Sequence, residues 1–150
     1  MAAQSEQIGQ NESLLDEVYF ATQMGLDAVE TILPQVKDAS LREQIEQHRK
    51  DYRSLGLKAK AMLHESGEQP KKEKLSQKMM LKSSIKMKTL ANHSTGHIAE
   101  LMINGTTMGI IDLTKKMNNM SESDAGAKQL ANDYISKEQK HIEILKQFLN

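Results

Sequence analysis

The chain has 150 residues, enough for one domain with a sizeable core, and its 20 basic and 20 acidic side chains cancel. This balance provides no bulk basic surface for nucleic acid, and the absence of Cys excludes disulfides and thiolate metal sites. No apolar run reaches the roughly 18 residues of a membrane span, and the polar N-terminus lacks a signal-peptide core. We therefore expect a cytoplasmic protein.

The composition is typical of an all-α protein, because alternating β patterns are few and only two Pro residues occur. Residues 1–10 are polar, and we expect them to form a disordered lead-in. Residues 11–150 are expected to form a single helical-bundle domain.

The first predicted helix begins near Asn11 or Ser13 and ends close to Pro34. The second begins after a cap at Asp38 or Ser40, and Gly67 and Pro70 interrupt it. The second helix has a regular seam with alternating spacings of four and three residues, typical of bundle packing. This seam consists of Leu41, Ile45, His48, Tyr52, Leu55, Ala59 and Met62.

Residues 71–91 are predicted to form a lysine-rich helix, roughly 30 Å long, that carries the chain back along the bundle. We expect a break at 92–96; the alternative is one unbroken helix over 71–117, which favours an exchanged dimer. The lysine-rich segment 71–88 is either a solvated face or a docking surface for an acidic partner.

The third predicted helix covers about 93–117, and between 98 and 114 its only charged residues are Glu100 and Asp112. A helix without a polar face is typical of one surrounded by other helices. The fourth begins near Ser123 and has a seam in which Glu138 and His141 occupy positions suited to Leu. Four helices of matched length predict a four-helix bundle with a long, helical crossover between its second and third helices.

Polar residues of these helices are expected to lie at one level of the bundle. At about 1.5 Å of helical rise per residue, counted from the turns, four residues are predicted to meet in the bundle interior. They are His48, Glu100, Glu138 and His141, and His97 and Glu30 are expected nearby. On the third helix, His93, His97 and Glu100 share one face, because their spacings are four and three residues. Glu138-x-x-His141 points a carboxylate and an imidazole the same way, which suits a cation with mixed oxygen and nitrogen ligands.

The architecture and Glu138-x-x-His141 resemble the ferritin-like superfamily, the rubrerythrin and bacterioferritin relatives. The resemblance implies a di-iron type of centre, with Glu100 as the third-helix ligand and Glu138 and His141 as the fourth-helix pair. The chain departs from the family in the second helix, where Ile45 stands three positions before His48 in place of Glu. The stretches around His97–Glu100 and Met108–Asp112 also resemble small bacterial helical proteins with no assigned activity.

Two functions stay open at this point. The first is a bundle with a site for iron or another divalent metal, formed by His48, Glu100, Glu138, His141, His97 and Glu30. The second is a non-catalytic structural or interaction bundle that binds no metal and whose core His and Glu residues only pair with each other. In either case we expect a homo-oligomer, with a dimer favoured.

Overall fold

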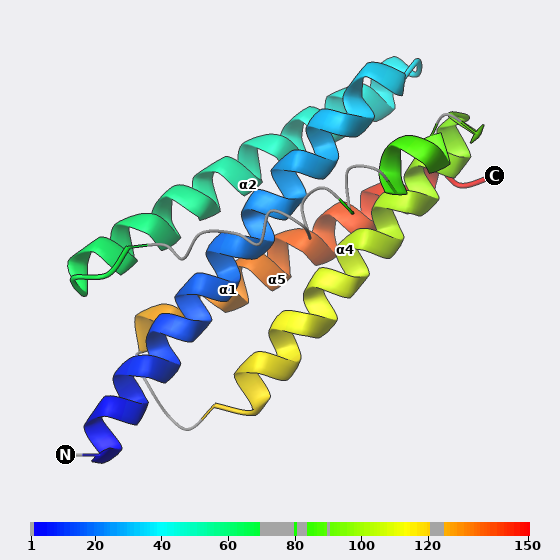
Figure 1. Ribbon diagram of the computed structural model, residues 1–150. Coiled ribbons are helices and arrows are strands. Elements are labelled where there is room, and N and C mark those ends of the chain that lie inside the picture. Colours follow the sequence, from blue (N-terminus) through cyan, green and yellow to red (C-terminus); the bar gives the residue numbers. More distant parts are fainter. Residues whose placement is uncertain (1, 70–79, 81–83, 90, 121–124) are drawn as a thin grey trace.

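The structure is a computed structural model that describes the backbone of residues 2–69, 80, 84–89, 91–120 and 125–150, and side chains from Leu14 onward in these ranges. Long helices lie side by side in it, and the described residues include no strand (Figure 1). An all-α helical bundle is thereby confirmed. The helices are α1 (Ala2–Ile32), α2 (Ala39–Glu65), α4 (Thr95–Asn118) and α5 (Ala125–Leu145), with 3-10 turns at Leu33–Gln35 and Lys146–Phe148.

α1 and α2 form an antiparallel hairpin whose turn follows from local sequence. Pro34 lies in the first turn of the 3-10 helix, where its missing N–H is not needed. Asp38 then caps α2, as predicted: its Oδ1 accepts a hydrogen bond of 2.8 Å from the Leu41 backbone N–H. Beyond the end of α2, Gly67 takes a φ of 80°, a backbone conformation that Gly adopts without a Cβ penalty.

The predicted break before the third helix is confirmed. Residues 92–94 are not helical, and the Ser94 hydroxyl caps α4 by accepting a hydrogen bond from the His97 N–H. A single helix over 71–117 is therefore excluded. α4 runs in the same direction as α2, and α5 returns beside it (Figure 1). Between α2 and α4 the described residues 84–89 are helical. Most of the predicted crossover helix over 71–91, and of the lysine-rich surface over 71–88, lies outside the described residues.

The start of α1 differs from the sequence prediction. Its backbone is helical from Ala2, whereas the sequence placed the first helix turn at Asn11 or Ser13. Within the described part of the chain, no helix combines the length and the hydropathy needed to cross a membrane.

The hydrophobic core lies between the four helices. Leu55 and Leu145 are buried, as their seams predicted. The third helix has a predicted seam with spacings of four and three residues: Ala99, Ile103, Thr106, Ile110, Leu113, Met117 and Met120. Of these, Ile103 and Ile110 are only half-buried. Three members of that seam are buried, Ala99, Thr106 and Leu113, and α4 also buries Ile98 and Met102 beside it. The correction has a simple cause: α4 carries so few charges that its sequence does not mark the face that points to water.

Tyr52 and Gly25 bring α2 close to α1. A Cβ built on Gly25 would lie 2.4 Å from the Cζ atom of Tyr52, so the ring occupies the space of the missing side chain. A Cβ on Gly105 in α4, by contrast, meets no atom of the described residues within 4 Å.

These two glycines provide a matched stability test. We expect Gly25→Ala to lower the free energy of unfolding, because the tyrosine ring must shift, despite the better helix propensity of Ala. Gly105→Ala should raise the unfolding free energy of the single chain by up to about 1 kcal/mol. Urea titration measures both values. Equal effects of the two substitutions would contradict the close packing of Tyr52 on α1.

Candidate functional site

A buried carboxylate, Glu138 of α5, lies at the centre of the polar core. His48 Nε2 of α2 is 2.6 Å from Glu138 Oε1, and the Tyr52 hydroxyl donates to Oε2 at 2.7 Å. His48 and Glu138 are each 1% exposed. Because an unpaired buried carboxylate is costly, these two donors make the position of Glu138 tenable. His48 and Tyr52 come from neighbouring turns of α2, so the site joins α2 to α5.

His141 of α5 lies one turn beyond Glu138 and is also fully engaged. Its Nδ1 is 2.7 Å from the side-chain amide nitrogen of Gln44, and its Nε2 is 2.7 Å from Asp51 Oδ2. An amide nitrogen only donates, so Nδ1 is the acceptor and the ring proton is assigned to Nε2, which donates to Asp51. Lys137 Nζ lies 3.7 Å from the other oxygen of Asp51. This arrangement is that of a neutral imidazole.

The aromatic rings of the site are stacked. The His48 ring lies 3.9 Å from the His141 ring and 4.4 Å from the Tyr52 ring, with interplanar angles of 18° and 22°. Two protonated imidazoles stacked in this way would repel each other. Within the described part of the chain, Nδ1 of His48 is buried without a hydrogen-bond partner.

Burial and the Glu138 carboxylate determine the titration of the surrounding groups. Burial raises the pKa of Tyr52 and of Tyr134 well above the usual value, and the negative charge of Glu138 raises both further. Burial lowers the pKa of His141, the neighbouring His48 lowers it further, and Asp51 partly offsets this shift. The two tyrosines and His141 are therefore held neutral in the folded protein.

Three of the six predicted site residues meet in the bundle interior: His48, Glu138 and His141. Glu100 and Glu30 are exposed, and His97 is half-buried. The expected burial of Glu100 beside His141 is therefore wrong, because α4 turns the face of His93, His97 and Glu100 away from the core. Glu100 would have been the third-helix carboxylate of a ferritin-like centre.

The sequence did not predict the polar contacts of four residues in the network: Gln44, Asp51, Tyr52 and Tyr134. A signal for two of them was present. Gln44, His48 and Asp51 are spaced by four and three residues, so they share one face of α2. Tyr52 was recognised only as a seam residue.

The arrangement does not fit the metal set that the ferritin-like resemblance implies. Both nitrogens of His141 and both oxygens of Glu138 are occupied by protein partners. The stacked rings of His48 and His141 lie face to face, so their nitrogens do not converge on a common point. Among the described residues, no group of three or more His, Asp or Glu side chains is arranged to hold a metal ion. Metal binding by these residues stays a prediction.

Comparison with known proteins supports the fold. No family model and no curated protein matches the chain. A solved structure, the crystal structure of a DUF305 fragment from Deinococcus radiodurans, is similar with a TM-score of 0.71. The match covers 92% of this chain and 93% of that one, at 14% sequence identity. At this identity the likeness shows a shared helical fold alone.

The Glu138 network generates a stability prediction. Glu138→Leu fills the seam with an apolar side chain but leaves the buried donors of His48 and Tyr52 without an acceptor. We expect it to cost about 3–5 kcal/mol in the free energy of unfolding, the usual loss when one member of a buried pair is removed.

The control removes the donors as well. The triple variant His48→Leu, Tyr52→Phe, Glu138→Leu should recover most of that stability, since no buried polar group is then left unpaired. Denaturant titration of both variants measures the difference. A single Glu138→Leu variant as stable as wild type would show that the network contributes nothing.

The lowered pKa of His141 makes folding pH-dependent. The unfolded chain takes up a proton near the ordinary His value of about 6.5, whereas the folded chain does so only at lower pH. The contribution of His141 to stability is therefore complete above about pH 6.5 and falls as the pH drops below it. NMR titration of the His141 ring should show this lowered pKa, and Asp51→Asn should lower it further. A pKa above 6.5 would contradict the neutral assignment.

Proposed function

We propose that this protein is a non-catalytic, ferritin-like interaction bundle, and that its core His and Glu residues only pair with each other. One observation carries the proposal: each oxygen of Glu138 and each nitrogen of His141 has a protein partner at 2.6–2.7 Å. A general base or a metal ligand needs a lone pair directed at the reacting atom or ion. In this site, the lone pairs of the Glu138 carboxylate and of His141 Nδ1 are directed at side chains of α2.

The network is suited to specify how α2 and α5 pack. Sliding α5 by one turn would carry Glu138 away from His48 and Tyr52 and leave a buried charge unpaired. Sites of this kind can select one register of helices among several apolar alternatives. The ferritin-like part of the proposal is supported by the parallel directions of α2 and α4 and by Glu138-x-x-His141 facing the core.

A metal site is the second candidate. It is favoured by the buried Nδ1 of His48, which has no hydrogen-bond partner among the described residues and lies beside a carboxylate and a second imidazole. Iron or another divalent metal would have to displace at least one of the hydrogen bonds of Glu138 or His141.

Metal titration separates the two candidates. For protein purified without a His-tag, we expect Fe(II) or Zn(II) to produce no binding heat and no change in melting temperature, since ligands that bind only the folded state raise it. Glu138→Gln and the matched surface variant Glu100→Gln serve as controls. A melting temperature that rises with metal in the wild type and in Glu100→Gln, but not in Glu138→Gln, would establish the metal site instead.

A further inference from the structure

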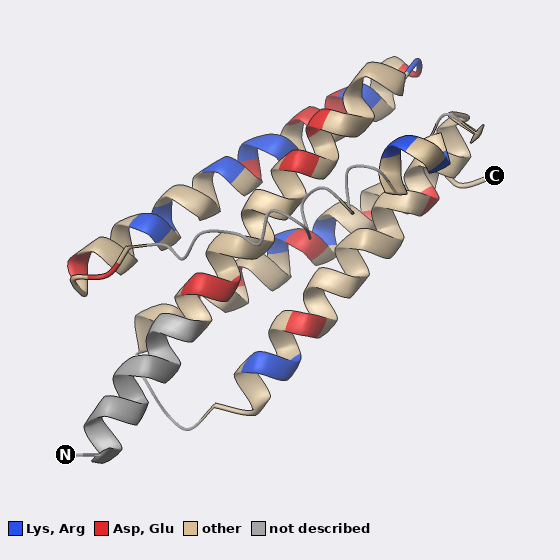
Figure 2. Ribbon diagram, in the orientation of Figure 1, with Lys and Arg blue, Asp and Glu red and all other residues tan. Residues whose placement is uncertain are grey.

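The middle of α4 is uncharged on all sides, yet one of its faces is exposed. No charged residue occurs between Glu100 and Asp112, and on α1 none occurs between Glu17 and Asp27 (Figure 2). On the open face of α4, Met108 is 59% exposed and Ile111 is 41% exposed. A helix without a charged face is normally covered, and clustered exposed apolar residues mark interaction surfaces.

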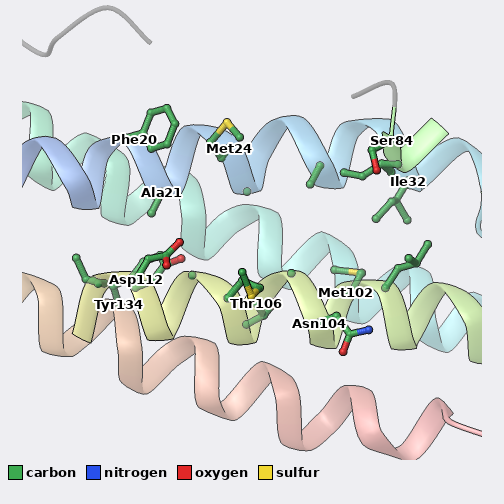
Figure 3. Close-up of a pocket in the computed structure, with 18 of the residues that line it drawn as sticks. Phe20, Ala21, Met24, Ile32, Ser84, Met102, Asn104, Thr106, Asp112 and Tyr134 are labelled. Atoms are coloured by element: carbon green, nitrogen blue, oxygen red, sulfur yellow. The ribbon is translucent and has the colours of Figure 1, made fainter. Parts of the chain in front are cut away.

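A groove of about 530 Å³ runs between α1 and α4 beside this face (Figure 3). Among the lining residues of each helix, four form a stripe with spacings of four, three and four positions. The stripes are Glu17, Ala21, Met24 and Ala28 of α1, and Leu101, Gly105, Met108 and Asp112 of α4. Such seams of small residues and Met are suited to receiving side chains of another helix.

Gly105 indicates that the groove is approached from outside the chain. The glycines Gly25 and Gly109 are accounted for internally, because a Cβ there would collide with Tyr52 and Tyr134. A Cβ on Gly105 meets nothing within 4 Å. Glycine inside a helix is destabilising relative to Ala, and no contact with the described residues accounts for Gly at this position.

The two ends of the groove have opposite charge. The lining includes Glu17, Asp112 and Lys88. Because α1 and α4 run in opposite directions, Glu17 near the start of α1 lies toward the same end as Asp112 near the end of α4, and Lys88 lies one helical turn from Ser84. Figure 3 places Asp112 and Ser84 at opposite ends of the groove. An apolar ligand with one charged head would account for one end only.

We propose that the groove is covered by the same groove of a second copy of this chain, related by a two-fold axis that crosses the groove at right angles. This operation reverses the direction of the groove, so the Glu17 and Asp112 of each copy lie over the Lys88 of the other. It also brings the exposed Met108 side chains of both copies into the interface. An isologous contact of this kind is self-complementary in both shape and charge. The dimer does not depend on whether the core network binds metal.

Molecular mass in solution tests the proposal. Sedimentation velocity over a concentration series should give a species of twice 16.9 kDa for the wild type. Gly105→Leu should yield a folded monomer with the helical content of the wild type, because Leu blocks the groove yet favours the helix. Leu57→Glu is the matched control: Leu57 is 68% exposed on α2, away from the groove, so this variant should remain dimeric. Monomeric wild type at every concentration, or a dimeric Gly105→Leu variant, would overturn the proposal.

Charge reversal tests the orientation of the two copies. Lys88→Glu and Asp112→Lys should each cause loss of dimer, because each places like charges together. The triple variant Glu17→Lys, Lys88→Glu, Asp112→Lys exchanges the charges at both ends and should restore the dimer. A triple variant as monomeric as the single ones would overturn the proposed two-fold arrangement.

Discussion

A carboxylate with no access to water constrains the whole bundle. Glu138 is acceptable inside the core only while His48 and Tyr52 donate to it, and both donors come from one face of α2. The relative rotation and height of α2 and α5 are therefore set by hydrogen bonds of fixed length, whereas apolar side chains alone would tolerate neighbouring arrangements.

This constraint extends to the other helices through two tyrosines. Tyr52 occupies the space that Gly25 leaves open on α1, and the Tyr134 hydroxyl lies where a Cβ on Gly109 of α4 would be. In both tyrosines, the hydroxyl end of the ring lies against a glycine of another helix and also belongs to the environment of Glu138. Larger residues at Gly25 or Gly109 would therefore act on the polar core without touching Glu138.

The sequence predicts burial where a polar residue interrupts an otherwise apolar seam. It does not predict which face is buried where a helix, such as α4, has almost no charged residues. His48 and Glu138 stand in apolar seams, so their burial could be predicted. The spacing of four and three residues also joins Gln44, His48 and Asp51 on α2, and His93, His97 and Glu100 on α4. Only the first set lies against the core, because spacing defines a common face but not its direction. The pairing of Asp51 with His141 depends on helix rotation across the bundle, which no local pattern encodes.

The ring of Tyr52 has a further consequence for local opening of the native protein. Because this one side chain packs on α1 at Gly25, belongs to α2 and donates to Glu138 of α5, separating any one of these helices disturbs the other two. α4 is joined to the same group, because its Thr106 interacts with Tyr52 and its Gly109 lies against the Tyr134 hydroxyl. Local opening of any one of the four helices therefore disturbs the surroundings of Glu138, and the amides that flank this core should exchange with solvent together.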